Sequence, residues 1–127
     1  MKLLEYEAKR LLQLSAIPTP KGELVDVAVS HSHKGDSPSF PAVVKSQVPV
    51  GGRGKLGGIK VVKNLSEYRA AIDVIGKLSI KNYVPNALLV EEAVDINREF
   101  YLSLVINRSR GTIDLLAHPD GGVEVES

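Results

Sequence analysis

The sequence predicts an α+β fold, an antiparallel or mixed sheet with flanking helices, and three observations carry this prediction. Residues 3–14 and 66–78 repeat apolar side chains with helical spacing. Several shorter segments either alternate apolar and polar residues or are continuously apolar, as strands are. A glycine-rich loop at residues 51–58 joins two of these strands and predicts a hairpin. We expect residues 1–127 to form one domain.

The N-terminal segment predicts a helix followed by a short strand and a loop. Glu5 and Lys9 form a favourable i,i+4 pair on helix 3–14. The prolines of "AIPTPKG" end this helix, because proline cannot continue one. "ELVDVAV" predicts a short strand running into a poor helix, and "SHSHKGDSPSF" predicts a surface loop. His31 and His33 in that loop have no third ligand nearby, and such pairs are far more often exposed side chains than metal ligands.

The central segment predicts two strands around the glycine loop and then the second helix. "PAVVKSQV" alternates, with Lys45 on one face and Ser46 on the other. "GIKVVK" is the returning strand, and Ser66 is a plausible N-cap for the helix that follows. The apolar face of that helix consists of Tyr68, Ala71, Ile72, Ile75 and Leu78.

The C-terminal segment predicts a buried strand and a hairpin. "NALLVEEAV" contains the apolar run 87–90, which is typical of a strand buried on both faces. Residues 99–117 predict a hairpin around "NRSRG". Its inward face is expected to carry Phe100, Leu102, Leu104 and Ile106. "DGGVEVES" begins another strand-like pattern, so we expect the chain to be a piece of a longer one.

Composition excludes several classes of protein. The 43% apolar and 24% charged residues fall in the ordinary globular range. The absence of cysteine excludes a disulfide-stapled scaffold and a thiolate metal site. "MKLLEYEAKRLL" lacks the apolar region of a signal peptide, and no apolar run approaches the ~20 residues of a membrane span. We expect a cytoplasmic protein, or a mitochondrial-matrix one if eukaryotic, without a membrane partner.

Positive charge gathers around the glycines although the net charge is only +1. No acidic residue lies between Asp36 and Glu67. The same stretch holds the five basic residues Lys45, Arg53, Lys55, Lys60 and Lys63. A wholly basic face would indicate nucleic acid, whereas one local cluster is sized for a small anion.

Three phosphate-binding templates can be compared with the glycine loop. No glycine in it starts a G-x-x-x-x-G-K-[ST] match. The dinucleotide fingerprint G-x-G-x-x-G matches at Gly52, Gly54 and Gly57, but that fingerprint must open a helix and here it opens a strand. A glycine hairpin laid over nucleotide phosphates remains, as in kinases, although the kinase motifs H-R-D and D-F-G are absent.

The loop has the chemistry of a phosphate cover. Glycines let backbone N–H groups converge on oxygens, and Arg53 can add a forked pair of charge-assisted hydrogen bonds. Lys45 adds a point charge from the preceding strand. The alternative is a mobile surface loop with incidental basic residues.

Several segments together resemble a known family. "LLEYEAKRLL", "IPTPKG", "VVKSQVPVGGRGKLGGIKVV", "LLVEEAVDINREFYLSLVINRSRG" and "GGVEVE" are similar, in order and spacing, to the opening of the succinyl-CoA synthetase (succinate–CoA ligase) β subunit. The resemblance covers nearly the whole chain and only about the first third of that subunit. It implies the N-terminal region of an ATP-grasp fold, in which two α+β subdomains hold ATP between them.

The resemblance also implies roles for individual residues. Lys45 and the run Gly52, Arg53 and Gly54 match phosphate-contacting positions. Glu91 matches the hinge beside the adenine, where backbone groups read the base edge, and Val94 matches a neighbouring hinge contact. Glu99 matches a carboxylate near the nucleotide and could accept a ribose hydroxyl. The alternative for Glu91 and Glu99 is a pair of solvated charges at strand ends.

Some features of that family are altered or missing here. Pro49 and Val50 replace the usual first two residues of H-A-G-G-R-G, which removes one backbone donor. The resemblance implies Mg²⁺ as cofactor of ATP, with ligands beyond this chain. It also implies a phosphorylated histidine on a partner α subunit, a role for which His118 has no claim. Pro20 falls where ATP-preferring members tend to carry proline, which favours ATP over GTP.

Three functional hypotheses follow. The first is the ATP-binding portion of an ADP-forming acid–CoA ligase, in which ATP, succinate or another short acid, and CoA give ADP, phosphate and the thioester. The chain alone is then expected to be inactive, with no catalytic residue of its own. The second is a nucleotide-binding or assembly module without turnover. The third, RNA binding through "GGRGK", lacks both an extended basic face and the aromatic residues needed for stacking.

Overall fold

The computed structural model describes residues 2–28 and 37–121, which form two compact units. The first unit is Met1–Val94 and the second is Asp95–Ser127. His31 and His33, most of the predicted loop around them, and the strand-like C-terminal pattern lie outside the described residues. Among the described residues, neither helix combines the length and the apolar composition needed to cross a membrane.

The first unit is built on a four-stranded sheet with the strand order β1-β4-β2-β3. The strands are β1 (Gly22–Asp26), β2 (Ala42–Ser46), β3 (Ile59–Val62) and β4 (Ala87–Glu92). All three neighbouring pairs are antiparallel, which confirms the expected α+β architecture. The apolar run of β4 lies between β1 and β2 and is buried, as predicted for a central strand.

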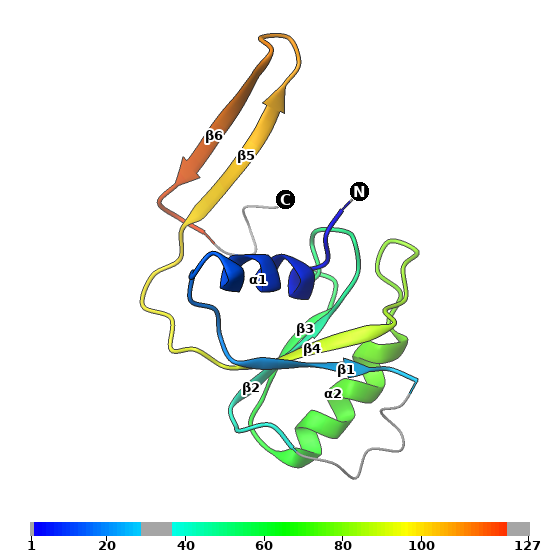
Figure 1. Cartoon of the computed structure of the whole chain (residues 1–127). Helices are drawn as coiled ribbons and strands as arrows, with labels where there is room; N and C mark the ends of the chain where they lie inside the picture. The colour runs from blue at the N-terminus through cyan, green and yellow to red at the C-terminus, as the bar shows by residue number, and fades with distance from the viewer. Residues whose placement is uncertain (1, 29–36, 122–127) are drawn as a thin grey trace. The chain divides into compact units, whose positions relative to one another are not determined.

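The helix α2 (Leu65–Lys77) covers one face of this sheet (Figure 1). The core between them is formed by Ala42, Val44, Val62, Ala71, Ile75, Leu88 and Val90. The N-cap lies two residues before the expected one, because the Oδ1 atom of Asn64, which is in extended conformation, accepts the N–H of Glu67 at 2.9 Å. The prediction of Ser66 as N-cap is therefore wrong, since Ser66 already lies within the first turn.

The helix α1 (Glu5–Leu14) lies over the opposite face of the sheet (Figure 1). No residue of α1 is buried, and Leu11 and Leu12, which follow the helical spacing of apolar residues in segment 3–14, are exposed. The amphipathic spacing predicted a helix correctly. Polar contacts rather than a buried apolar stripe attach it to the sheet, as described below.

The second unit contains a hairpin of β5 (Tyr101–Asn107) and β6 (Thr112–His118), which pair in antiparallel register. Its existence confirms the predicted hairpin, but the side chains expected to face inward are exposed. Leu104, for example, pairs with Leu115 and is 70% exposed. The prediction was wrong in this respect, because alternation sorts side chains onto two faces without saying what covers either. Within this unit β5 and β6 are the only elements described.

Candidate functional site

Five charged side chains from α1, β2, the glycine loop and β4 meet between α1 and the sheet. They are Glu5 and Lys9 of α1, Lys45 of β2, Arg53 of the loop and Glu91 of β4. We refer to these five residues as the ion-pair cluster. Three are cations and two are carboxylates, so the cluster carries a net positive charge.

The register of the sheet explains why Lys45 and Glu91 lie close together. Val44 and Val90 are paired and point toward α2, so the residues next to them in sequence point toward α1. Lys45 is opposite Leu89, and Val43 is opposite Glu91, which makes Lys45 and Glu91 diagonal neighbours on that face. A slip of one residue in either strand would separate them.

Glu91 is the most deeply buried member of the ion-pair cluster, with 3% of its surface exposed. Lys9 Nζ lies 2.6 Å from each of its carboxylate oxygens, and Lys45 Nζ lies 2.6 Å from Oε1. Opposite it on β1 is Gly22, where a Cβ atom would lie 2.8 Å from Glu91 Cγ. Glycine at this position leaves room for the carboxylate stem. The alternative of a solvated strand-end charge is therefore wrong for Glu91.

Glu5 binds both of the cations that were predicted to contact phosphate. Its Oε2 accepts a hydrogen bond from Arg53 Nη2 at 2.6 Å. Its Oε1 lies 2.9 Å from Lys45 Nζ and 3.0 Å from Lys9 Nζ. Three cations, from the loop, from β2 and from α1 itself, thus converge on one carboxylate group.

The glycine loop is a hairpin, as predicted, because β2 and β3 pair antiparallel up to Lys45 opposite Ile59. Ser46 N donates to Gly58 O, and Gly58 N donates to Arg53 O, both at 2.7 Å. Gly52 has a φ of +80°, a left-handed conformation that L side chains rarely adopt. Arg53 Nη1 donates to Ser46 O at 2.7 Å. The loop therefore has a hydrogen-bonded conformation of its own.

The ion pairs shift the pKa of Glu5 and of Lys45. Burial by itself would raise the pKa of Glu5, but hydrogen bonding to Lys45 and the charges of Lys45 and Arg53 outweigh it and lower the pKa to about 2. Burial would likewise lower the pKa of Lys45, whereas its bonds to Glu91 and Glu5 raise it above 10.5. Both groups are charged at neutral pH.

The remaining predicted site residues do not join the ion-pair cluster. Gly52 and Gly54 belong to the loop that carries Arg53. Val94 is the last residue of the first unit and is 53% exposed. Glu99 is exposed and belongs to the second unit. The main chain of Glu91, predicted to read a base edge, is paired with β1 and β2. The N–H groups of the next two residues, Glu92 and Ala93, donate to the carbonyls of Lys21 and Pro41. Val94 is the first residue after these paired positions.

Sequence reasoning missed the contribution of α1. Glu5 and Lys9 were recognised only as an i,i+4 pair, which is a common feature of exposed helices. Their charge spacing alone carries no signal for a partner on a distant strand.

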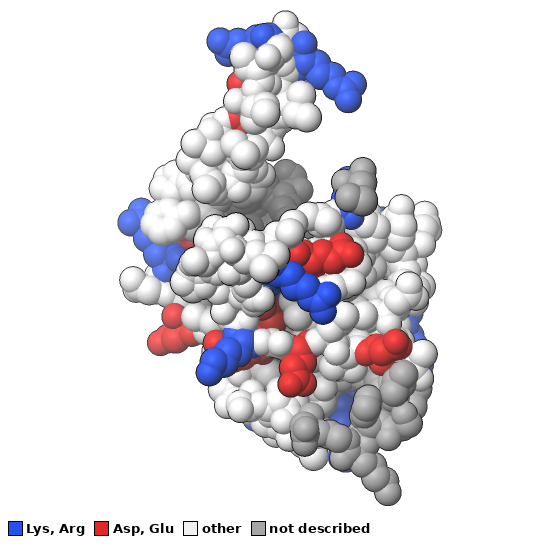
Figure 2. Space-filling view, in the orientation of Figure 1, with Lys and Arg blue, Asp and Glu red and all other residues white. Residues whose placement is uncertain are grey.

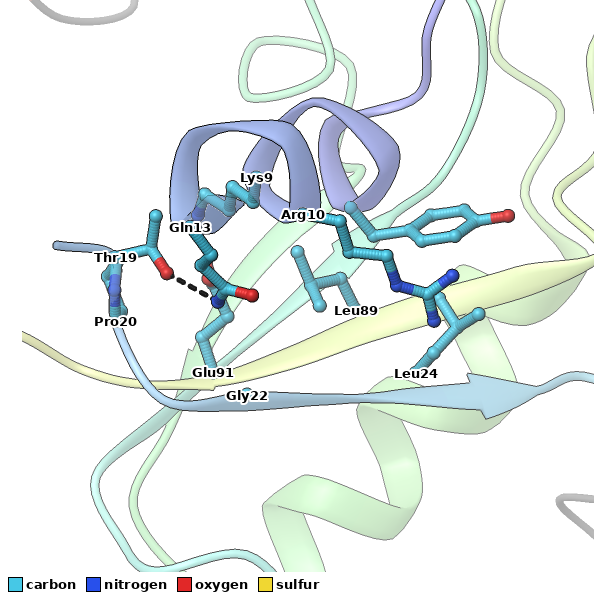
Figure 3. A pocket seen from close by; sticks show the side chains of 10 residues that line it. Lys9, Arg10, Gln13, Thr19, Pro20, Gly22, Leu24, Leu89 and Glu91 are labelled. Atoms are coloured by element: carbon cyan, nitrogen blue, oxygen red, sulfur yellow. Dashed lines mark hydrogen bonds and ion pairs between the residues drawn. The ribbon is translucent and has the colours of Figure 1, made fainter. Parts of the chain in front are cut away.

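A small pocket with a volume of about 110 Å³ lies beside Lys9 and Glu91, with Pro20 at its wall (Figure 3). This volume is below the roughly 300 Å³ of small-molecule sites, so the pocket cannot enclose a nucleotide.

The described residues contain no group of three or more His, Asp or Glu side chains that could hold a metal ion. Both carboxylates of the ion-pair cluster are already bound by lysine or arginine, so this cluster does not fit Mg²⁺.

Figure 2 shows basic and acidic side chains interspersed on the visible face of the first unit. Such a face is unlike the continuous basic surface that binds nucleic acid.

Comparison with known proteins defines the class of this protein. A family model described as an ATP-grasp domain matches residues 2–127, and the chain belongs to this family. Solved structures agree with the fold. The chain superimposes with a TM-score of 0.70 and 26% identity on a dinucleotide-forming acetyl-coenzyme A synthetase from Ca. Korarchaeum cryptofilum, over 94% of this chain and 54% of that one. For D-alanine-D-alanine ligase from Helicobacter pylori the TM-score is 0.58 at 19% identity, over 91% of this chain and 32% of that one.

Within that class, the chain is similar to β subunits of CoA ligases. It is 41% identical, over its full length, to the β subunit of the ADP-forming succinate–CoA ligase of Halobacterium salinarum, of which it spans 33%. It is 43% identical to a subunit of an ADP-forming sulfoacetate-CoA ligase from Bilophila wadsworthia, over 99% of this chain and 33% of that protein. The chain therefore spans about a third of the length of these relatives.

Proposed function

We propose that this chain provides part of the nucleotide-phosphate site of an ADP-forming acid–CoA ligase β subunit. One observation carries the proposal, namely that Lys45 and Arg53 converge on a single oxyanion, the carboxylate of Glu5, at 2.9 and 2.6 Å. Phosphate oxygens are recognised by the same kind of paired, charge-assisted donors. The membership in the ATP-grasp family and the similarity to CoA-ligase β subunits point to ATP as the source of those phosphates.

The chain's own residues would bind and orient the nucleotide. Arg53 would donate its forked N–H groups to phosphate oxygens, Lys45 would add a fixed positive charge, and the backbone of Gly52 and Gly54 would allow close approach. We further propose that the adenine lies near Val94 and that Glu99 accepts a ribose hydroxyl. Mg²⁺ would neutralise phosphate charge when bound, but the described residues offer no ligand set for it.

The overall reaction proposed is the conversion of ATP, a short carboxylic acid and CoA into ADP, phosphate and the acyl-CoA thioester. By similarity to the β subunits, we propose an α subunit as the partner, and that this subunit carries the histidine that becomes phosphorylated. The proposed location is the cytoplasm. The relatives are named for succinate and for sulfoacetate, so the class of acid is proposed only as a short carboxylate. The alternative is a nucleotide-binding or assembly module without turnover, since phosphoryl transfer needs a metal ion and a positioned nucleophile.

Calorimetric titration of ATP, ADP and adenosine into the chain tests the phosphate site. Arg53→Lys keeps the charge but loses the fork, so ATP affinity should fall roughly tenfold, since a charge-assisted hydrogen bond contributes about 1.5–3 kcal/mol. Lys45→Ala should weaken ATP more than adenosine, because only the phosphates interact with that charge. Lys60→Ala, on the exposed part of β3, is the matched control and should change neither.

The unfolding transition of each variant is measured first, because Lys45 also pairs with buried Glu91. Binding is then compared at a temperature where all variants are folded. Unchanged ATP affinity in both Arg53→Lys and Lys45→Ala would contradict the phosphate site. A separate assay of ADP formation with Mg²⁺, CoA and succinate should show no turnover by the chain alone. Turnover at an enzyme-like rate would instead show that the chain is catalytically sufficient.

A further inference from the structure

Glu5 holds the arginine of the glycine loop in a defined orientation. Arg53 Nη2 donates to Glu5 Oε2 at 2.6 Å, while Nη1 donates to Ser46 O at 2.7 Å. These contacts fix both terminal nitrogens of a planar group. They use two of the five N–H donors that a guanidinium has, so Glu5 can anchor Arg53 while other donors face a ligand.

None of the residues of α1 is buried. Polar contacts link this helix to the sheet and to the glycine loop. They comprise the ion pairs of Glu5 and Lys9 and the hydrogen bond from Tyr6 N to Gln47 Oε1 at 3.0 Å. Glu5 therefore connects α1 to the loop that carries Arg53, and the position of α1 and the position of Arg53 depend on the same carboxylate.

The charge of Glu5 does not abolish the attraction of the site for an anion. The ion-pair cluster contains three cations and two carboxylates, so it keeps a net charge of +1 with Glu5 ionised. Lys45 is shared with Glu91 and keeps one carboxylate partner if Glu5 is removed. Arg53 has its carboxylate contact in the cluster only with Glu5. Loss of Glu5 should therefore affect Arg53 more than Lys45.

We propose that Glu5 is a positioning residue for the nucleotide phosphates, which acts by holding Arg53 of the glycine loop in place before the nucleotide arrives. This inference rests on the function proposed above. The loop contains five glycines between residues 51 and 58, so without an anchor the Arg53 side chain would have to be ordered at the moment of binding. Immobilising one long side chain corresponds to a loss of affinity of roughly three- to tenfold.

A double-mutant cycle in ATP binding tests the proposal. Glu5→Gln should weaken ATP binding about three- to tenfold and leave adenosine binding unchanged. Glu5→Asp keeps the charge but withdraws it by one methylene, and should give an intermediate loss. Glu7→Gln removes a carboxylate from the same helix outside the ion-pair cluster and is the matched control, with ATP affinity as in the wild type. In an Arg53→Lys background, Glu5→Gln should have little further effect, because the two residues act as one unit.

Several outcomes would overturn the proposal. An equal loss for ATP and adenosine, or a full additional loss in the Arg53→Lys background, would show that Glu5 only supports the fold. Tighter ATP binding by Glu5→Gln would show that Glu5 competes with phosphate. If Arg53→Lys weakens ATP binding and Glu5→Gln does not, the positioning role alone is refuted. If neither Arg53→Lys nor Lys45→Ala affects ATP, the proposed function itself fails.

Discussion

Acid titration should reveal how strongly Glu5 is bound in the folded chain. Its pKa is lowered from 4.5 to about 2 by Lys45, Arg53 and Lys9 acting against burial. A carboxylate with a depressed pKa in the folded state stabilises that state above its unfolded pKa, and the stabilisation is lost as the pH falls through the folded pKa. The shift corresponds to about 3 kcal/mol at neutral pH, of which about 2 kcal/mol is lost by pH ~3.

Urea unfolding of the wild type and of Glu5→Gln between pH ~7 and ~3 measures this contribution, since the other carboxylates are common to both proteins. At neutral pH the wild type should be the more stable. On acidification it should lose about 2 kcal/mol more than Glu5→Gln, because a protonated glutamate resembles glutamine. The difference should persist at high salt, since half-buried ion pairs are screened less than exposed ones. Parallel loss of stability in the two proteins would refute the ion-pair geometry around Glu5.

Five further substitutions test other parts of the first and second units by thermal or urea unfolding. Glu91→Gln leaves two lysines facing an uncharged group and should cost about 2–4 kcal/mol, whereas exposed Glu92→Gln should change stability by less than about 1 kcal/mol. Equal effects of these two changes would contradict the burial of Glu91. Leu88→Ala in the core should cost about 2–5 kcal/mol, while Leu104→Ala, at a position 70% exposed, should cost less than about 1 kcal/mol in this chain. Gly58→Ala should cost about 1–3 kcal/mol because the new Cβ would lie 2.5 Å from the nearest side-chain atom, and a neutral result would show that the loop can shift.

Local patterns in the sequence were enough for most elements and for part of the site. Period-2 alternation identified the strand carrying Lys45, and the glycines identified the loop carrying Arg53. The apolar run before Glu91 identified a strand buried on both faces, which the sheet order confirms. These signals are local because they arise from backbone geometry and from the polarity of neighbouring residues. The cap of α2 was misplaced by two residues for the same reason, since Asn64 and Ser66 are both good capping residues.

Local sequence patterns were sufficient to predict that a glycine hairpin with basic residues follows a strand that presents Lys45, and that two helices accompany the sheet. Which charges meet depends instead on how these elements pack. Glu5 and Arg53 are 48 residues apart, and Lys9 and Glu91 are 82 residues apart, so no periodicity could pair them. Likewise, alternation in β5 defined an apolar face, but only the three-dimensional arrangement could say whether it is covered. Both cases have the same cause. The spacing of residues along the chain fixes the direction of a side chain relative to its own helix or strand. The residues that this side chain contacts are set by how helices and strands pack against one another.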